Sequence, residues 1–323
     1  MRRTLLLLCC SSLLAPLLVA PALAQSYPDR QIRLVIPFPP GGGTDIAARL
    51  VGEKLGAVLK QSVIPDNKPG ANGVIASEFV ARAAPDGYTL LVATGSSHAF
   101  APALGVKLSF DPIKDFAPIA LIGQFPTVLV VNPAVPAKTM GEFVDYARKN
   151  PGKINFGSAG NGSTNHFLGE LVKQVAGIDM VHVPYKGSGP ASADLLAGQI
   201  QVMVDSVAAA KGNIDAGKLR ALGVTTTQRV AQLPDVPTLK EAGYDIEYAG
   251  WVVIMAPAAT PADTLAKLNA AINGVMADPA VVDRYNKQGI VIRTMSLAEL
   301  PIYLRNDKER WAQVAAKAGL KAE

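Results

Sequence analysis

The most constraining feature of this sequence lies at residues 31–59, where a short apolar segment runs through a proline- and glycine-rich turn into a helical pattern. Aliphatic residues at 32–36 predict a strand, and apolar residues recurring every three or four positions predict a helix over 46–59. The first N–H groups of such a helix have no partner within it, and the helix dipole makes this end positive. The turn is therefore a candidate anion site, in which we expect a carboxylate.

The residues of the turn suit this chemistry. Gly41, Gly42 and Gly43 let the backbone approach a ligand closely. Thr44 can cap the helix and offer its hydroxyl to the same ligand. Asp45 either meets a ligand amine or stands in the first helical turn because the dipole favours an acid there. The structural alternative is a strand–helix turn that needs small residues only for packing.

Residues 1–24 have the pattern of a secretory signal peptide, with Arg2 and Arg3 before an apolar segment and the sequence ALA before Gln25. A membrane anchor is the alternative, but serines and a proline interrupt the segment and it is short for a span. Lipid attachment at Cys9 or Cys10 is disfavoured because neither follows a small residue. We expect a periplasmic product.

Removal of this segment takes both cysteines of the chain and leaves His98, His166 and His182 as the imidazoles. No two of these histidines have the spacing of metal ligands, so we expect neither a metal nor a cofactor. The net charge falls from +5 to about +3, which is too small and too dispersed for a nucleic-acid-binding protein.

The remaining length of about 299 residues fits two domains or one large α/β unit. Strand and helix patterns alternate, and aromatic residues are only 6% of the chain, which favours helices packed on mainly parallel sheets. A strand is expected at 88–93, followed by a polar loop at 94–98 that contains Ser96 and Ser97. Ligands of open α/β sheets bind at such carboxyl ends, so this loop should face the same crevice as the glycine turn.

A second unit of strand, glycine-rich turn and helix covers 153–176. Ser158, Gly160, Ser163 and Thr164 belong to its turn. The pattern predicts two lobes that each offer a helix N-terminus to a shared cleft. Further strands are expected at 125–132, at 180–184, at 199–205 with one face buried, at 219–225 and at 248–256. Further helices are expected at 140–149, 262–277 and 297–318.

Several segments together resemble the extracytoplasmic solute-binding proteins of tripartite tricarboxylate transporters, often called the Bug family. They span the whole chain after the signal, in the family's order. The matching segments are 37–45 (PFPPGGGTD), 85–90 (PDGYTL), 157–160 (GSAG), 183–187 (VPYKG), 235–238 (DVPT), 250–251 (GW) and 256–257 (AP).

The resemblance implies a two-lobed periplasmic binding protein of the type II, Venus-flytrap class, with the ligand in a cleft between the lobes. We place lobe I at 25–127 and 250–323 and lobe II at 128–249. Members of the family bind small carboxylates: dicarboxylates, tricarboxylates, acidic amino acids or aromatic acids. The expected partner is the membrane permease of such a transporter.

Individual candidates keep a structural alternative. His166 either meets the anion or is exposed to solvent. Lys186 either complements the field of the pocket or is an ordinary surface lysine. Asp205, at the end of an apolar strand, orders water, takes a ligand amine or caps the next helix. Phe38 and Trp251 either wall the ligand or simply pack. The complete set of expected ligand-binding residues is Phe38, Pro40, Gly41, Gly42, Gly43, Thr44, Asp45, Ser96, Ser97, Ser158, Gly160, Ser163, Thr164, His166, Tyr185, Lys186, Asp205 and Trp251.

The rival class is a secreted hydrolase. The segment from Gly95 to Ala99 partly matches a nucleophile elbow, which needs glycine at its last position and a helix directly after it. Pro102 disfavours an immediate helix, and no zinc-protease, Walker A or dinucleotide motif is present. We therefore expect a binding protein without catalytic residues. A carboxylate-sensing subunit that docks on a membrane signalling protein would share the same fold and ligand.

Overall fold

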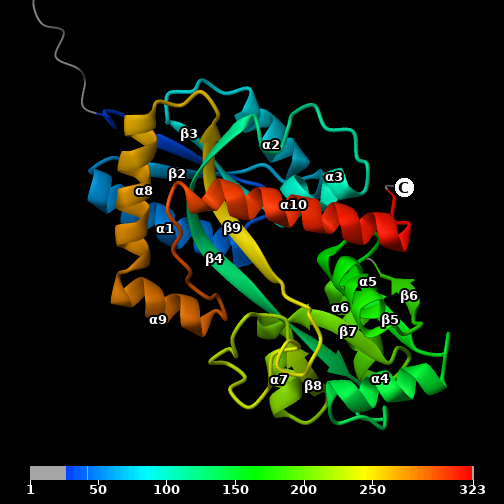
Figure 1. Cartoon of the computed structure of the whole chain (residues 1–323). Helices are drawn as coiled ribbons and strands as arrows, with labels where there is room; N and C mark the ends of the chain where they lie inside the picture. Colours follow the sequence, from blue (N-terminus) through cyan, green and yellow to red (C-terminus); the bar gives the residue numbers. More distant parts are fainter. Residues whose placement is uncertain (1–26, 42, 186, 322–323) are drawn as a thin grey trace, which may run out of the picture.

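The computed structural model describes residues 27–41, 43–185 and 187–321. The predicted signal peptide, Gly42 and Lys186 lie outside the described residues. Mixed α/β structure forms two lobes, as predicted (Figure 1). No helix in these three described ranges is long and apolar enough to cross a membrane.

The sheet of lobe I has the strand order β2-β1-β3-β9-β4. Its strands are β1 (Ile32–Ile36), β2 (Val63–Asn67), β3 (Thr89–Thr94), β9 (Ala249–Pro257) and the first part of β4 (Phe116–Val131). Its helices are α1 (Gly43–Leu59), α2 (Val74–Ala81), α8 (Ala262–Met276) and α9 (Pro279–Lys287), with the short helices η1 (Ala71–Gly73), η2 (Ser96–Phe100) and α3 (Ala101–Ala103). Apolar side chains cover both faces of this sheet, because α1 and α8 pack on one face and α2 on the other.

The sheet of lobe II is built on the second part of β4. Beside it lie β7 (Val202–Ser206), β5 (Asn155–Ser158) and β6 (Val181–Pro184) on one edge and β8 (Arg220–Val224) on the other. Its helices are α4 (Met140–Lys149), α5 (Thr164–Ala176), α6 (Ser188–Leu196) and α7 (Val207–Asp215). Serine and threonine side chains start three of them: Thr139, Ser163 and Ser206 each accept a backbone N–H of the first turn.

Two strands carry the chain between the lobes. β4 pairs with β9 as far as Pro126 and with β7 from Thr127 onward, so a single strand belongs to both sheets. Figure 1 shows β4 in green and β9 in yellow running together from one lobe into the other. Because the pleat alternates, Gln124 and Phe125 point to opposite sides of this crossing.

The C-terminal helix α10 (Glu299–Ala318) lies across both lobes (Figure 1). Leu300 and Leu304 pack in a core cluster of lobe I, whereas Trp311 packs in the main cluster of lobe II. The Phe100 ring stacks on Phe167 of α5 at 4.6 Å between centroids, and both rings meet Trp311 edge-on. Side chains that precede and follow lobe II in sequence therefore complete its core.

Several local predictions were correct: the helix over 140–149 was predicted without error, and α8 ends one residue earlier than expected. The sheets are not mainly parallel, because both crossing strands pair antiparallel with their neighbours. Strand β7 is buried on both faces rather than one, since Met203 and Asp205 are covered like Val202 and Val204. No bounds were predicted for helices α7 and α9.

The prediction of a polar loop at 94–98 was wrong. Residues Ser96–Phe100 form a turn of π-helix that continues directly into α3. Pro102 does not prevent this helix, because it stands in the first turn of α3, where no backbone N–H is needed. The argument from Pro102 against a nucleophile elbow therefore fails, although the sequence still lacks the final glycine of that motif.

Candidate functional site

Three loops of lobe I meet at the carboxyl ends of β1 and β3. A Cβ placed on Gly73 of η1 would lie 3.0 Å from Cβ of Pro37 and 3.5 Å from Oγ of Ser97. The turn after β1, the short helix η1 and the start of η2 therefore touch one another. We expected the glycine turn and the segment at 94–98 to face the same crevice, because both follow the carboxyl ends of strands. The contacts of Gly73 with Pro37 and Ser97 bring these two segments together.

Asp45 holds the glycine turn in shape. Its buried carboxylate accepts the N–H of Gly41 at 2.9 Å, the Nε of Arg49 and the Nδ2 of Asn67. Asn67 also donates to the carbonyl of Phe38, so β2 is tied to the same turn. Burial alone would raise the pKa of Asp45, but the bonds from Arg49, Asn67 and Gly41 outweigh it and hold the pKa below its ordinary value.

This network bears on the role of Asp45. Asp45 stands in the first turn of α1, where the dipole favours an acid, and three donors already occupy its oxygens. Contact with a ligand amine remains a prediction. The backbone of Gly41 has φ +92°, a conformation that glycine adopts without strain. Pro40 and Gly43 are exposed beside it, Thr44 is half-buried, and Phe38 is half-buried.

Phe125 is a site residue that the sequence reasoning missed. A Cβ on Gly43 would lie 2.9 Å from Cε1 of its ring, so the crossing strand closes one side of the glycine turn. A larger residue at position 43 would require the ring to shift. A predicted strand across 125–132 gave no signal for this, because the contact joins residues 82 positions apart in sequence.

Ser97 is buried next to His98 rather than facing solvent. Its Oγ lies 2.9 Å from Nδ1 of His98 and 3.3 Å from Oγ of Ser77. The His98 ring packs against Phe116, and burial lowers its pKa to about 3, so the imidazole is neutral at physiological pH. Within the described ranges no acid contacts this pair, and Nε2 of His98 has no hydrogen-bond partner. Ser96, by contrast, is half-buried at the start of η2.

In lobe II the turn after β5 is joined to the turn after β6. The N–H of Tyr185 donates to the carbonyl of Ser158, and the N–H of Gly187 donates to the carbonyl of Ala159. Gly160 has φ +121°, and a Cβ there would lie 3.1 Å from the carbonyl oxygen of Tyr185. The close approach of the two turns therefore depends on glycine at position 160.

Two histidines support this turn from behind. Oγ of Ser158 lies 2.6 Å from Nε2 of His182, and the His182 ring stacks on His166 with 3.7 Å between centroids. His166 in turn accepts the N–H of Gly162 at its Nδ1. Burial, with help from His166 and Lys173, lowers the pKa of His182 to about 4. His166 is buried, so the solvent-exposed alternative was wrong for this residue.

The N-terminus of α5 stands at the end of the same turn. Ser163 caps it through a bond from the N–H of His166, and Phe167 in its first turn stacks on Phe100, whose ring also lies beside Tyr248 on the chain segment that returns to lobe I. Gly162 lies against the side chain of Leu104 from lobe I. The lobe II turn and the first turn of α5 are therefore in contact with lobe I.

The other candidates of lobe II are engaged within that lobe. Tyr185 donates its hydroxyl to Asp194 at 2.7 Å, and burial together with Asp194 raises its pKa to about 12. Asp205 is buried and accepts the hydroxyl of Ser192 and the N–H of Ser206. Burial raises the pKa of Asp205 above its ordinary value because no cation of the described chain pairs with it. It also does not cap α7 itself, since Ser206 does.

Trp251 is buried in β9, and its indole Nε1 donates to Asp307 of α10 at 2.7 Å. Trp311 donates to the other oxygen of the same carboxylate at 2.9 Å. This arrangement ties the crossing strand to the helix that spans both lobes. Of the two alternatives for Trp251, walling the ligand or packing within the protein, this contact corresponds to packing.

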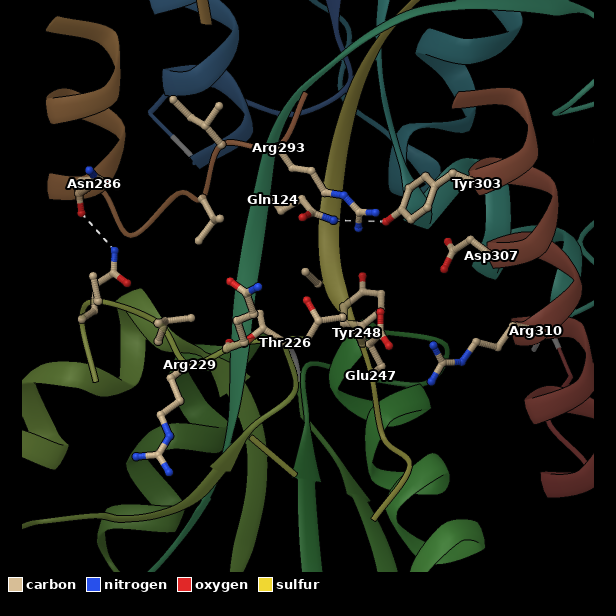
Figure 2. A pocket seen from close by; sticks show the side chains of 18 residues that line it. Gln124, Thr226, Arg229, Glu247, Tyr248, Asn286, Arg293, Tyr303, Asp307 and Arg310 are labelled. Carbon is tan, nitrogen blue, oxygen red and sulfur yellow. Dashed lines mark hydrogen bonds between the residues drawn. The ribbon is translucent and has the colours of Figure 1, made fainter. Parts of the chain in front are cut away.

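The Gln124 side of the crossing holds a cavity of about 630 Å³ between the lobes, shown in Figure 2. We name it the Gln124 cavity. None of the sixteen expected residues that the structure describes lines it. Its lining consists of Gln124, Thr226, Thr227, Gln228, Arg229, Val230, Ala231, Gln232, Glu247, Tyr248, Ala249, Asn286, Val291, Ile292, Arg293, Tyr303, Asp307 and Arg310.

Comparison with known protein families finds one matching family model, the tripartite tricarboxylate transporter family receptor, over residues 47–320. Solved structures show the same likeness across almost the whole chain. The periplasmic binding protein BugD is 33% identical, with a TM-score of 0.73 over 92% of this chain and 100% of that protein.

Two similar structures contain a ligand. Rpa4515 of Rhodopseudomonas palustris, solved with adipate, is 33% identical, with a TM-score of 0.77 over 91% of this chain and 99% of that one. MatC (Rpa3494) of the same organism, solved with bound malate, is 34% identical, with a TM-score of 0.72 over 89% of this chain and 99% of that one. Both ligands are dicarboxylates.

Proposed function

This chain belongs to the tripartite tricarboxylate transporter receptor family, and from that premise we propose that it captures a small organic carboxylate between its lobes and delivers it to a membrane permease. The family consists of periplasmic solute-binding receptors and not of enzymes, as the sequence predicted. Adipate and malate in two similar structures support a carboxylate as the ligand here. The predicted signal peptide supports export to the periplasm.

One observation carries the proposal: both lobes present their carboxyl-end turns beside the same crossing strands. In lobe I the glycine turn abuts Phe125 of β4. In lobe II the first turn of α5 packs through Phe167 on Phe100, beside Tyr248, and Gly162 touches Leu104. Each lobe therefore offers the start of a helix, where backbone N–H groups without intrahelical partners favour an anion.

We propose that the ligand is held mainly by backbone N–H groups and neutral hydroxyls of these turns. The contact residues are drawn from the turn at 38–45, from Ser96, and from Ser163 and Thr164. Ser97, Ser158, His166, Tyr185, Asp205 and Trp251 act from behind, because their side chains are already bonded to neighbours and shape the turns. Gly42 and Lys186 keep the ligand-binding roles predicted from the sequence.

The lobes that close on the ligand are proposed as 25–127 with 250–323, and 128–249. The change of partner of β4 between Pro126 and Thr127 supports the first boundary, and the start of β9 at Ala249 supports the second. A ligand that contacts both lobes only when they meet stabilises the closed arrangement. The permease would then recognise the closed form. A sensing subunit, the alternative role, would use the same closure.

The test is a thermal-shift and calorimetric screen against adipate, malate, citrate, benzoate and glutamate. A ligand at one hundred times its dissociation constant should stabilise the protein by about 2.7 kcal/mol, which raises Tm by roughly 2–4 °C for a chain of this size. If all five acids leave Tm unchanged and release no heat, carboxylate capture is refuted.

Helix caps offer matched variants for locating the site. Ser163→Ala removes the cap of α5, and Thr139→Ala removes the equivalent cap of α4, which lies in lobe II away from the crossing. Each should cost about 1 kcal/mol of stability. Of these two cap variants, only Ser163→Ala should weaken binding of the acid, by about tenfold. Gly42→Val should abolish binding while leaving the circular dichroism spectrum largely intact. If Ser163→Ala and Gly42→Val bind the acid as tightly as Thr139→Ala and the wild type, neither turn belongs to the site.

A further inference from the structure

The glycine turn of lobe I is proposed to bind an anion, yet two of its own groups repel negative charge. The carboxylate of Asp45 is buried in the first turn of α1 and stays ionised, because hydrogen bonds hold its pKa below the ordinary value. The carbonyl of Phe38 stands at the start of the turn, and a carbonyl oxygen carries partial negative charge. A ligand carboxylate is bound here only if both groups are neutralised or turned away from it.

The side-chain amide of Asn67 serves both of these groups. Its Nδ2 donates to the carbonyl oxygen of Phe38 at 2.8 Å and to Oδ1 of Asp45 at 2.8 Å. Its Oδ1 accepts Nη2 of Arg49 at 2.7 Å, and Nε of Arg49 is bonded to the carboxylate of Asp45. Asn67, Asp45 and Arg49 therefore bond one another in a ring beneath the turn.

The pairing of two strands places Asn67 beside the turn. Asn67 is the last residue of β2 and lies in register with Ile36, the last residue of β1. The N–H of Lys68 donates to the carbonyl of Ile36 at 2.8 Å, which continues this pairing by one bond. Because the turn begins two residues after Ile36, the amide of Asn67 reaches it from a neighbouring strand whose position does not depend on the turn.

Few backbone donors of the turn are left for a ligand. Pro39 and Pro40 have no N–H, and the N–H of Gly41 is given to Asp45. The donors that can face an anion therefore begin after Gly41 and include those of Gly43 and Thr44, in the first turn of α1, which lack intrahelical partners. The orientation of this short segment decides whether the turn presents N–H groups or carbonyl oxygens.

We infer that Asn67 is a positioning residue for the ligand, an inference that rests on the proposed function. Its amide keeps the carbonyl of Phe38 and the carboxylate of Asp45 engaged beneath the turn, so that the N–H groups at the start of α1 face the anion. The chemistry selects asparagine, because an amide supplies two N–H donors and an acceptor. Aspartate has the same shape but no donor when ionised, and it adds negative charge; leucine has a similar shape and no polar group.

The test compares Asn67→Asp and Asn67→Leu with the wild type. The probe is whichever of adipate, malate, citrate, benzoate and glutamate binds the wild type most tightly, with its affinity measured by calorimetry at about pH 7.5. Asn67→Asp should weaken binding at least about tenfold, because it removes both donors and adds a charge beside the anion. Asn67→Leu should weaken it at least about threefold, because the donors are lost without added charge. Circular dichroism checks that both variants are folded.

Asn132→Asp is the matched control. Asn132 follows β4 in lobe II, where its Nδ2 donates to the carbonyl of Leu195 at 2.8 Å and its Oδ1 accepts the N–H of Ala134. The same substitution there removes a bond to a carbonyl and adds the same charge, so it should lower Tm as Asn67→Asp does and leave the affinity unchanged. A residue that only stabilised the fold would give the two variants equal affinities.

The outcomes separate this inference from the proposed function. If an acid binds the wild type and either folded variant of Asn67 binds it equally well, the positioning role is refuted and carboxylate capture stands. If Asn132→Asp weakens binding as much as Asn67→Asp, the positioning role is refuted as well. If none of the five acids binds the wild type, carboxylate capture is refuted and the role of Asn67 falls with it.

Discussion

His98 should make this protein sensitive to mild acid. Its imidazole is buried in lobe I against Phe116, Phe110 and Trp251, and burial lowers its pKa from 6.5 to about 3. In the unfolded chain the same imidazole accepts a proton near pH 6.5. Between these two values the unfolded state binds more protons than the folded state. Stability that is fully present above about pH 6.5 is therefore lost progressively as the pH falls toward 3.

The size of the effect follows from the difference in protonation. At about pH 5 an unfolded histidine is protonated about thirtyfold over neutral, which favours unfolding by RT ln 30, or about 2 kcal/mol. Any folded pKa below about 4 gives the same result, because the folded imidazole is then still neutral at that pH. His182, with a pKa of about 4, adds a loss of similar size.

The assay is urea unfolding followed by circular dichroism at about pH 7.5 and about pH 5, for the wild type and His98→Gln. Glutamine has a similar volume, can keep the bond with Ser97 and does not titrate. The variant keeps the contribution of His182, so the difference between the two losses isolates His98. We expect the wild type to lose about 2 kcal/mol more than the variant over this interval.

Equal losses in the two proteins would refute the reasoning, because they would mean that His98 titrates normally in the folded state. A proton-resonance titration of the histidines gives an independent check. The His98 signals should stay unshifted from pH 7 to about pH 4, where the folded protein still holds a neutral imidazole.

Three further predictions concern groups that hold the lobes and the glycine turn. Asp307→Asn leaves one of the two indole N–H groups without an acceptor and gives the other a neutral one, and it should lower unfolding stability by about 1–3 kcal/mol in urea titrations; an unchanged midpoint would contradict it. Phe100→Ala empties the centre of the aromatic cluster and should cost about 3–5 kcal/mol by the same measurement, with exposed Phe79→Ala as a control of small effect. Asp45→Asn should weaken binding of the acid found by the screen. In the wild type the lowered pKa of Asp45 contributes stability that is present above the ordinary aspartate pKa and is lost as the pH falls through the lowered value. The variant lacks this contribution, so its stability curve against pH should be flatter on the acid side.

The sequence predicted most of the elements because their signals are local. The helix over 140–149 has its threonine cap and its apolar spacing within ten residues, and the two glycine turns follow directly from the strands before them. Helix α7 was not located because its nine residues, rich in alanine, have weak apolar periodicity. Helix α9 is amphipathic, but nine residues are shorter than the window of about 11–18 residues over which the periodicity is recognised. The π-helical turn at Ser96–Phe100 was missed because serines next to a glycine have the composition of a loop.

Site residues divide in the same way. The turns at 38–45 and 158–164 were found because they contain glycine beside capping residues. The roles of Asp45, Ser158 and Trp251 were not predictable, since each depends on a partner from another element: Asn67, His182 and Asp307. A polar residue at the carboxyl end of a strand is the one signal that could have pointed to Asn67. No signal in the sequence points to Phe125 or to the Gln124 cavity.

By itself, the sequence determined the alternation of strands and helices, the two glycine turns and the family, because these features are written in neighbouring residues. The tertiary structure alone decided which side of the crossing strand each residue faces, how α10 joins the two lobes, and that a cavity lies between the lobes on the Gln124 side. These depend on contacts between residues tens to hundreds of positions apart, such as Gln124 with Tyr303 or Phe100 with Trp311, and only folding brings such pairs together.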